Sequence, residues 1–152
     1  MENYEINDET FAVVATEEKK AKVIEKSCEY NIDNSAYSIM DESCKYYGSS
    51  YDGRMKAAKK ILDCKYKLPI LVEESSCLIF FPIKSTVCSD CTWINLNSVK
   101  KIEKVNNFSK ITFINDKEIL VDVSKMSLDN QIYRSSRYES IMLKRINSKK
   151  RD

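Results

Sequence analysis

The 152-residue sequence contains no histidine, only two glycines and two prolines, and a single tryptophan. Without histidine, the chain lacks the most common general base and the usual partner of a serine or cysteine nucleophile. The glycine-rich motifs that bind phosphate groups or expose a catalytic serine are also missing. These absences argue against an enzyme, and we expect no cofactor.

Long apolar segments are missing as well. The longest, CLIFFPI at residues 77–83, is far shorter than the roughly 20 residues that a membrane-spanning helix needs. The acidic start MENYEINDET is unlike the basic first region of a secretory signal peptide. Since 43% of the residues are hydrophobic, we expect a single domain over residues 1–152 in the cytoplasm, away from membranes, with a frayed basic tail at 146–152.

Six cysteines are present, at positions 28, 44, 64, 77, 88 and 91. Because the start of the chain does not suggest export, we expect thiols rather than disulfides. Cys88 and Cys91 have the C-x-x-C spacing of metal ligands, but a structural zinc site needs four ligands and no second C-x-x-C follows. We therefore expect no bound metal, with Cys88 and Cys91 as weak candidates for a metal or redox site.

The net charge of +2 conceals a strong asymmetry along the chain. Residues 1–44 carry 4 basic and 11 acidic side chains, whereas residues 45–67 carry 7 basic and 2 acidic ones. Such a distribution predicts a basic surface for a polyanion, together with an acidic flank that faces away from it or contacts another protein.

Hydrophobic patterns predict an α+β fold dominated by antiparallel β-sheet, with no helix-turn-helix. The clearest signal is a hairpin over residues 110–123, whose turn lies at 115–117. The segment CKYY at 44–47 is interpreted as a further strand. The other predicted strands are residues 10–16, 21–25, 36–40, 69–73, 77–83, 92–96 and 99–105.

Two segments have helical periodicity instead. Between residues 52 and 64, apolar residues recur at helical spacing, and Lys56, Lys59 and Lys60 fall within about 100° of arc on the other side. The second helix is expected from Leu128 to Ile146 with Ser127 as its N-cap. Four basic residues gather opposite its apolar side, namely Arg134, Arg137, Lys144 and Arg145. The prediction is a short central basic helix and a C-terminal helix.

Both glycines lie beside the central basic helix. Gly48 is expected to close the strand that ends at CKYY, and Gly53 falls in the first turn of the helix, where glycine is unfavourable. A phosphate could approach the backbone there, bound by helix amides, by Arg54 and by the hydroxyls of Ser49, Ser50 and Tyr51. The alternative is that both are simple turn glycines.

Five sequence blocks resemble, in their order and spacing, the competence transcription factor family, ComK. They are SCKYYGSSYDGR at 43–54, KLPILV at 67–72, FFP at 80–82, WIN at 93–95 and LDNQIYR at 128–134. The resemblance implies a sequence-specific DNA-binding activator of genes for DNA uptake, which recognises paired AT-rich boxes as a dimer, largely through the minor groove. The implied partners are double-stranded DNA and further copies of the chain, as a homodimer or a higher oligomer, with RNA polymerase as another candidate.

On this hypothesis, basic side chains contact the groove and the phosphates. The expected groove contacts are Arg54, Lys56, Lys59 and Lys60, with Arg134 and Arg137 as a second set, and the expected phosphate contacts are Lys45, Tyr51, Lys65 and Lys67. If about 6 phosphates are neutralised per protomer, log K falls with log salt at a slope near −5. Trp93 is expected in the core rather than as a wedge between bases.

Interpretations of the basic residues that do not involve DNA also stay open. The lysine face could be merely solvated, and Arg134 and Arg137 could pair with acidic residues of the N-terminal block. Two other classes of function also remain: a protein-interaction module that binds DNA without AT preference, and a cysteine-based redox or metal sensor.

Overall fold

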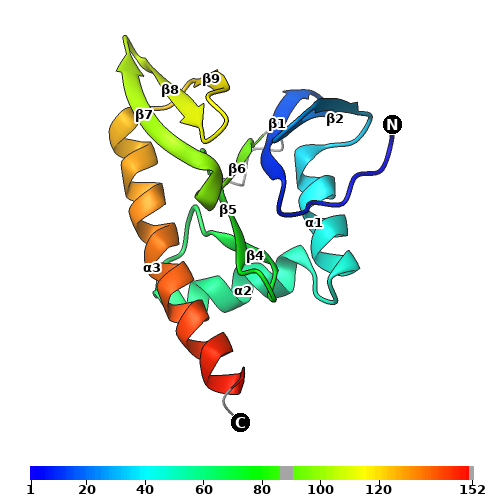
Figure 1. Cartoon of the computed structure of the whole chain (residues 1–152), viewed down its shortest axis with the longest axis vertical. Helices are drawn as coiled ribbons and strands as arrows, with labels where there is room; N and C mark the ends of the chain where they lie inside the picture. The colour runs from blue at the N-terminus through cyan, green and yellow to red at the C-terminus, as the bar shows by residue number, and fades with distance from the viewer. Residues whose placement is uncertain (86–90, 151–152) are drawn as a thin grey trace.

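The computed structural model describes residues 1–85 and 91–150, without the side chain of residue 150. Within these residues, nine strands and three α-helices form two antiparallel sheets with helices packed around them (Figure 1). None of the described helices is both long enough and apolar enough to cross a membrane. The α+β class that periodicity predicts is confirmed, and no helix-turn-helix is evident in the described chain.

The larger sheet has six strands in the order β3-β2-β1-β6-β5-β4. These strands are β1 (Thr10–Glu17), β2 (Lys20–Glu25), β3 (Glu29–Ile32), β4 (Ile70–Glu73), β5 (Leu78–Pro82) and β6 (Trp93–Asn95). The smaller sheet has the order β7-β8-β9, made of β7 (Val99–Val105), β8 (Phe108–Phe113) and β9 (Glu118–Val121). A short 3₁₀ turn, η1 (Leu96–Ser98), connects the two sheets.

Alternate side chains of the larger sheet point to its two faces, and both faces are covered at β4, β5 and β6, whose residues are almost all buried. One face packs on α1 (Ala36–Tyr46) and on the start of α2 (Tyr51–Leu62), with Trp93 at its centre. The other face packs on the smaller sheet and on α3 (Lys125–Lys150). Trp93 is almost completely buried, which confirms that it belongs to the core.

The predicted strand at residues 36–40 is wrong, because this segment begins α1. Ser35 caps the helix, its hydroxyl accepting from the Ser38 amide at 3.0 Å. Ile39, Met40 and Cys44 are buried at helical spacing, and a short apolar run fits either period until its cap is recognised. The CKYY segment therefore ends a helix rather than a strand, and β3 is a strand that the sequence analysis missed.

The C-terminal helix is longer than predicted at both ends. Its first turn is capped by the Ser124 hydroxyl, which accepts from the Ser127 amide at 3.1 Å, so Ser127 is not the cap. α3 then continues to Lys150, and Ile146 is buried against its neighbours. Residues 146–150 are thus helical rather than a frayed tail.

Gly48 provides the turn between α1 and α2. Its φ of 92° lies where side chains are strained, and its amide donates to the Lys45 carbonyl at 3.0 Å. We expect Gly48→Ala to lower the free energy of unfolding by about 1–2 kcal/mol, because alanine tolerates this backbone region poorly. Urea denaturation measures the loss. Asparagine accepts positive φ more readily, so Gly48→Asn should lose less, and equal stability of Gly48→Ala and the parent chain would contradict the prediction.

Candidate nucleic-acid interface

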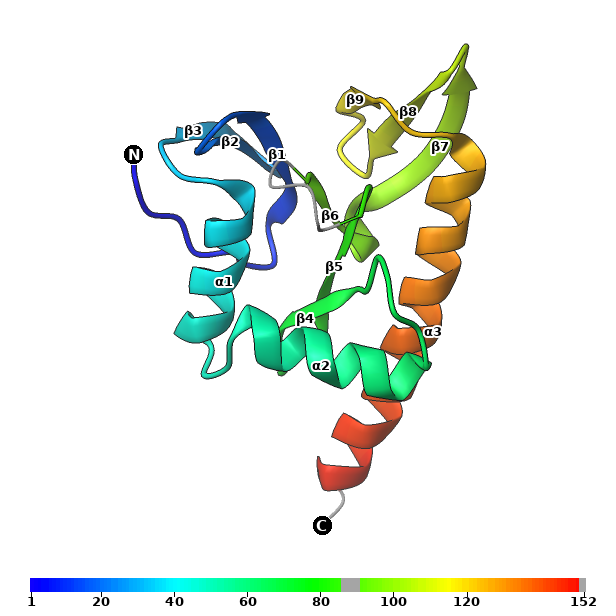
Figure 2. The same cartoon turned by 180° about the vertical axis from the view of Figure 1, so that it is seen from behind.

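The two basic helices pack against each other. α2 crosses α3 in both views of the molecule (Figures 1 and 2), and an apolar cluster fills the crossing. The cluster includes Ala58 and Leu62 of α2 and Tyr138 and Ile146 of α3, together with residues of β4 and β5. The apolar sides of both helices are therefore turned inward, and the basic residues on their other sides face solvent.

The loop that follows α2 is held against α3 by two polar side chains. Gln131 is buried, and its Nε2 donates to the Lys67 carbonyl at 3.0 Å and to the Pro82 carbonyl at 2.8 Å. Arg134 Nη1 donates to the carbonyls of Tyr66 and Lys67 and, at 2.8 Å, to Gln131 Oε1. We call Gln131 and Arg134 the loop clamp. It keeps Lys65 and the exposed Tyr66 beside the two helices.

Along α2, the loop and α3, seven cations are exposed without an ion pair or hydrogen bond to any other described residue. They are Lys59, Lys60, Lys65, Arg137, Lys144, Arg145 and Lys149, and we call them the basic stripe. Unpaired surface cations leave their charge available to a polyanion. Of the predicted contacts, the stripe includes Lys59, Lys60, Lys65 and Arg137. Lys144, Arg145 and Lys149 are not among the predicted contacts, although the basic side of the predicted helix includes the first two.

Other predicted contact residues have partners within the protein. Lys45 Nζ lies 3.0 Å from Asp41, whose carboxylate raises the pKa of the lysine, and Lys56 Nζ lies 2.9 Å from Asp52. Lys67 Nζ donates to the Ser127 hydroxyl at 3.2 Å. Arg134 belongs to the loop clamp, not to an ion pair with the acidic N-terminal block. These cations are therefore less available to a polyanion than those of the stripe.

The structure does not support the hypothesised phosphate site at the start of α2. The Tyr51 amide donates to Asp41 Oδ1 and the Gly53 amide to the Ser50 hydroxyl, both at 3.0 Å. Burial raises the pKa of Asp41, but the Tyr51 amide and Lys45 outweigh this and lower it, so a carboxylate stands where a phosphate was expected. Tyr51 is itself buried against Trp93, which removes it from the candidate contacts.

Gly53 and Arg54 both lie at positions where they support the fold. A Cβ at Gly53 would lie 3.2 Å from the Ser50 hydroxyl and 3.4 Å from that of Ser49, so glycine leaves room for the helix cap. The Arg54 side chain is half-buried near Cys44 of α1 and Tyr138 of α3, and its Nε has no hydrogen-bond partner among the described residues. Arg54 thus lies at the junction of the three helices.

The cysteines give little support to a metal or redox site. Cys88 lies outside the described residues, and Cys91 is buried, with its thiol donating to the Lys84 carbonyl at 3.5 Å. Across the described residues, no three acidic or cysteine side chains gather as metal ligands would. Burial raises the pKa of Cys44 and of Cys77 to about 11, so both are protonated and unreactive at neutral pH.

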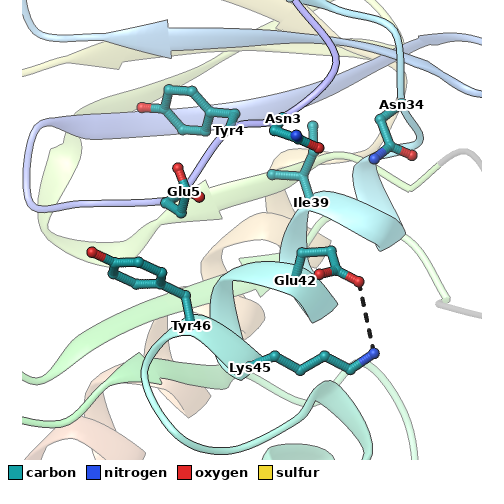
Figure 3. Close-up of a pocket in the computed structure, with 8 residues that line it drawn as sticks. All are labelled: Asn3, Tyr4, Glu5, Asn34, Ile39, Glu42, Lys45 and Tyr46. Carbon is teal, nitrogen blue, oxygen red and sulfur yellow. Dashed lines mark ion pairs between the residues drawn. The ribbon is translucent and has the colours of Figure 1, made fainter.

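The opposite edge of the molecule is acidic. Here α1 and the N-terminal segment border a cavity of about 390 Å³, whose lining includes Glu5, Glu42 and Tyr46 (Figure 3). Glu42 Oε1 lies 3.7 Å from Lys45 Nζ, the pair marked in that view. The charge asymmetry of the sequence therefore becomes a spatial one, with α1 and α3 along opposite edges (Figure 2).

Comparison with known proteins agrees with these features. A family model described as "ComK protein" matches residues 1–147. The chain is also 34% identical over 141 residues to the competence transcription factor of Bacillus subtilis (strain 168), covering 90% of this chain and 73% of that protein. No solved structure matches the chain. These matches support a role as a transcription regulator rather than an enzyme, and the chain belongs to the ComK family.

Proposed function

We propose that this protein is a sequence-specific DNA-binding activator of competence genes, which recognises AT-rich duplex largely through the minor groove. The observation that carries the proposal is the basic stripe, where two crossing helices and the clamped loop expose seven cations without partners in the described chain. Family membership supplies the role in transcription, and the stripe supplies the surface for the polyanion.

Groove shape provides the selectivity in this proposal. In the minor groove, bases distinguish mainly A·T from G·C pairs, but a narrow A-tract groove has a stronger negative potential that attracts arginine and lysine. Arg137 on α3 and Lys59 and Lys60 on α2 are the groove candidates, because each is exposed and without an ion pair to another described residue. Lys65 and the C-terminal cations of α3 would contact phosphates.

The proposed active form is a homodimer or a higher homo-oligomer in the cytoplasm. Paired AT-rich boxes require two DNA-binding surfaces with a fixed spacing, which symmetric assembly provides. The acidic edge around α1 lies opposite the edge formed by α3 (Figure 2). It would therefore remain accessible to another protein on the promoter, and RNA polymerase is the candidate.

Competition binding tests the proposal. We expect the full chain to prefer an A-tract duplex to a GC-rich duplex of equal length by at least about tenfold, with log K falling against log salt at a slope near −5. Fluorescence anisotropy over a salt series measures both quantities. Equal affinity for the two duplexes would refute the proposal and favour a protein-interaction module.

A further inference from the structure

The β7–β8 hairpin projects from the body beyond the start of α3 (Figures 1 and 2). Val105 pairs with Phe108 across a two-residue turn of Asn106 and Asn107, and Asn106 has a φ of 55°. The turn is therefore tight, and the tip is narrow. Nothing in the basic stripe or the loop clamp uses this tip.

One face of the tip is apolar and exposed. The strand pairing places Val105, Phe108 and Leu120 on the same side of the smaller sheet, where they are 38%, 45% and 60% exposed. With the two asparagines, they line a hollow of about 300 Å³. An apolar surface at the end of a projecting hairpin is unfavourable in water, which suggests that a binding partner covers it.

The turn segment at the tip carries positive charge alone, which favours an anionic partner. Residues 104–108 contain one lysine and no acidic residue, and Lys104 forms no ion pair with any other described residue. Of the acids near the tip, Glu103 lies 3.6 Å and Glu118 2.9 Å from Lys110 Nζ. Asp122, which follows Val121 at the end of β9, is exposed and forms no ion pair with another described residue. The tip thus combines a cation and two amides with apolar side chains.

We propose that this tip is a second DNA-contacting element, with Asn106, Asn107 and Lys104 in the minor groove and Phe108 wedged between two base pairs. The inference rests on the proposed function. Minor-groove proteins use amide and basic side chains to read A·T pairs and insert apolar wedges between base steps, and β-ribbons can enter the groove. The chemistry of the tip matches this combination.

The geometry allows one duplex to contact both elements. α3 has 26 residues and is about 39 Å long at 1.5 Å per residue, close to the roughly 34 Å of one DNA turn. The hairpin lies near the start of α3 (Figure 1), Arg137 lies at the middle of the helix, and Lys144, Arg145 and Lys149 lie in its second half. The tip and the C-terminal cations of α3 would therefore contact one duplex about one turn apart, the tip in the minor groove and these cations at phosphates.

The test uses the full chain and A-tract duplexes that carry 2-aminopurine at successive positions. We expect the parent protein to raise the fluorescence at one or two steps, where Phe108 unstacks the probe. Phe108→Ala should remove this signal and weaken binding about tenfold with an unchanged salt slope, because no charge is lost. Asn107→Asp, which leaves the apolar face intact, should also weaken binding, through repulsion from the phosphates. Tyr46→Ala, which removes an exposed ring on α1, is the control and should change neither the fluorescence signal nor the affinity.

Three outcomes would overturn the inference. The first is a Phe108→Ala protein that keeps both its affinity and the fluorescence signal. The second is a Phe108→Ala protein whose mass on light scattering is lower than that of the parent oligomer, which would assign the apolar tip to contacts between copies of the chain. The third is a parent protein without A-tract preference, which refutes the proposed function before any variant is compared, so the two failures are distinguishable. Thermal unfolding confirms that each variant is folded.

Discussion

Replacing Lys59, Lys60 and Arg137 together by alanine is expected to reduce affinity for an A-tract duplex about 100-fold at 0.1 M salt. Each phosphate or groove contact that a cation makes releases a counterion, and each lost contact changes the salt slope by about 0.9. The slope should therefore move from near −5 towards −2. All three side chains are exposed and without an ion pair to another described residue, so the free energy of unfolding should change by less than about 0.5 kcal/mol.

A matched control removes three positive charges from the acidic side of the molecule. Lys19→Asn, Lys20→Ala and Lys26→Ala together make the same change in net charge, at positions near the β1–β2 hairpin. Asparagine is chosen at position 19 because Lys19 has a φ of 59°. If the control variant lost as much affinity as the stripe variant, net charge rather than the stripe would explain the binding.

Much of the basic surface could be predicted from the sequence because helical periodicity is a local property. The spacing of Met55, Ala58 and Leu62 was enough to place Lys59 and Lys60 on the solvent side. The pattern of α3 likewise put Arg137 opposite the apolar residues. Hydrophobic alternation also identified the β8–β9 hairpin, and it is confirmed.

What failed depended on contacts between distant segments. The sequence leaves open whether Gly53 and the serines form a phosphate site or a simple turn. The contact it could not indicate is that of Asp41, ten residues away from Tyr51, which accepts from the Tyr51 amide once α1 and α2 fold against each other. The local pattern could not indicate this contact, because residues 36–40 were assigned to a strand. An Asp four residues before Lys45 would have suggested a helical pair if α1 had been recognised.

The blocks that carry the family resemblance take on a physical meaning in the fold. KLPILV at 67–72 and LDNQIYR at 128–134 meet through the loop clamp, where Gln131 and Arg134 bind the carbonyls of residues 66 and 67. The FFP block joins them, since Gln131 also binds the Pro82 carbonyl. Arg134, predicted to contact DNA directly, holds the loop that carries Lys65.

Gln131→Leu is therefore expected to affect both stability and DNA binding. The substitution leaves the Lys67 and Pro82 carbonyls without their buried donor and removes the Oε1 acceptor of Arg134. Each buried polar group left unpaired costs about 1–3 kcal/mol, so the free energy of unfolding in urea should fall by about 2–4 kcal/mol. A released loop also moves Lys65 away from the stripe, which lowers DNA affinity in conditions where the variant remains folded.

Two further variants distinguish an effect of the loop clamp from an effect of a general loss of packing. Asn130→Leu makes a similar change at the exposed neighbouring position and should alter neither quantity. Arg134→Lys keeps the charge and the bonds of Gln131 to the carbonyls, but loses the guanidinium that reaches two loop carbonyls and Oε1 together. It should cost about 1 kcal/mol and weaken DNA binding a few-fold. If Arg134→Lys instead reduced binding as much as loss of a stripe cation while stability stayed unchanged, Arg134 would contact DNA directly and the clamp would not be its role.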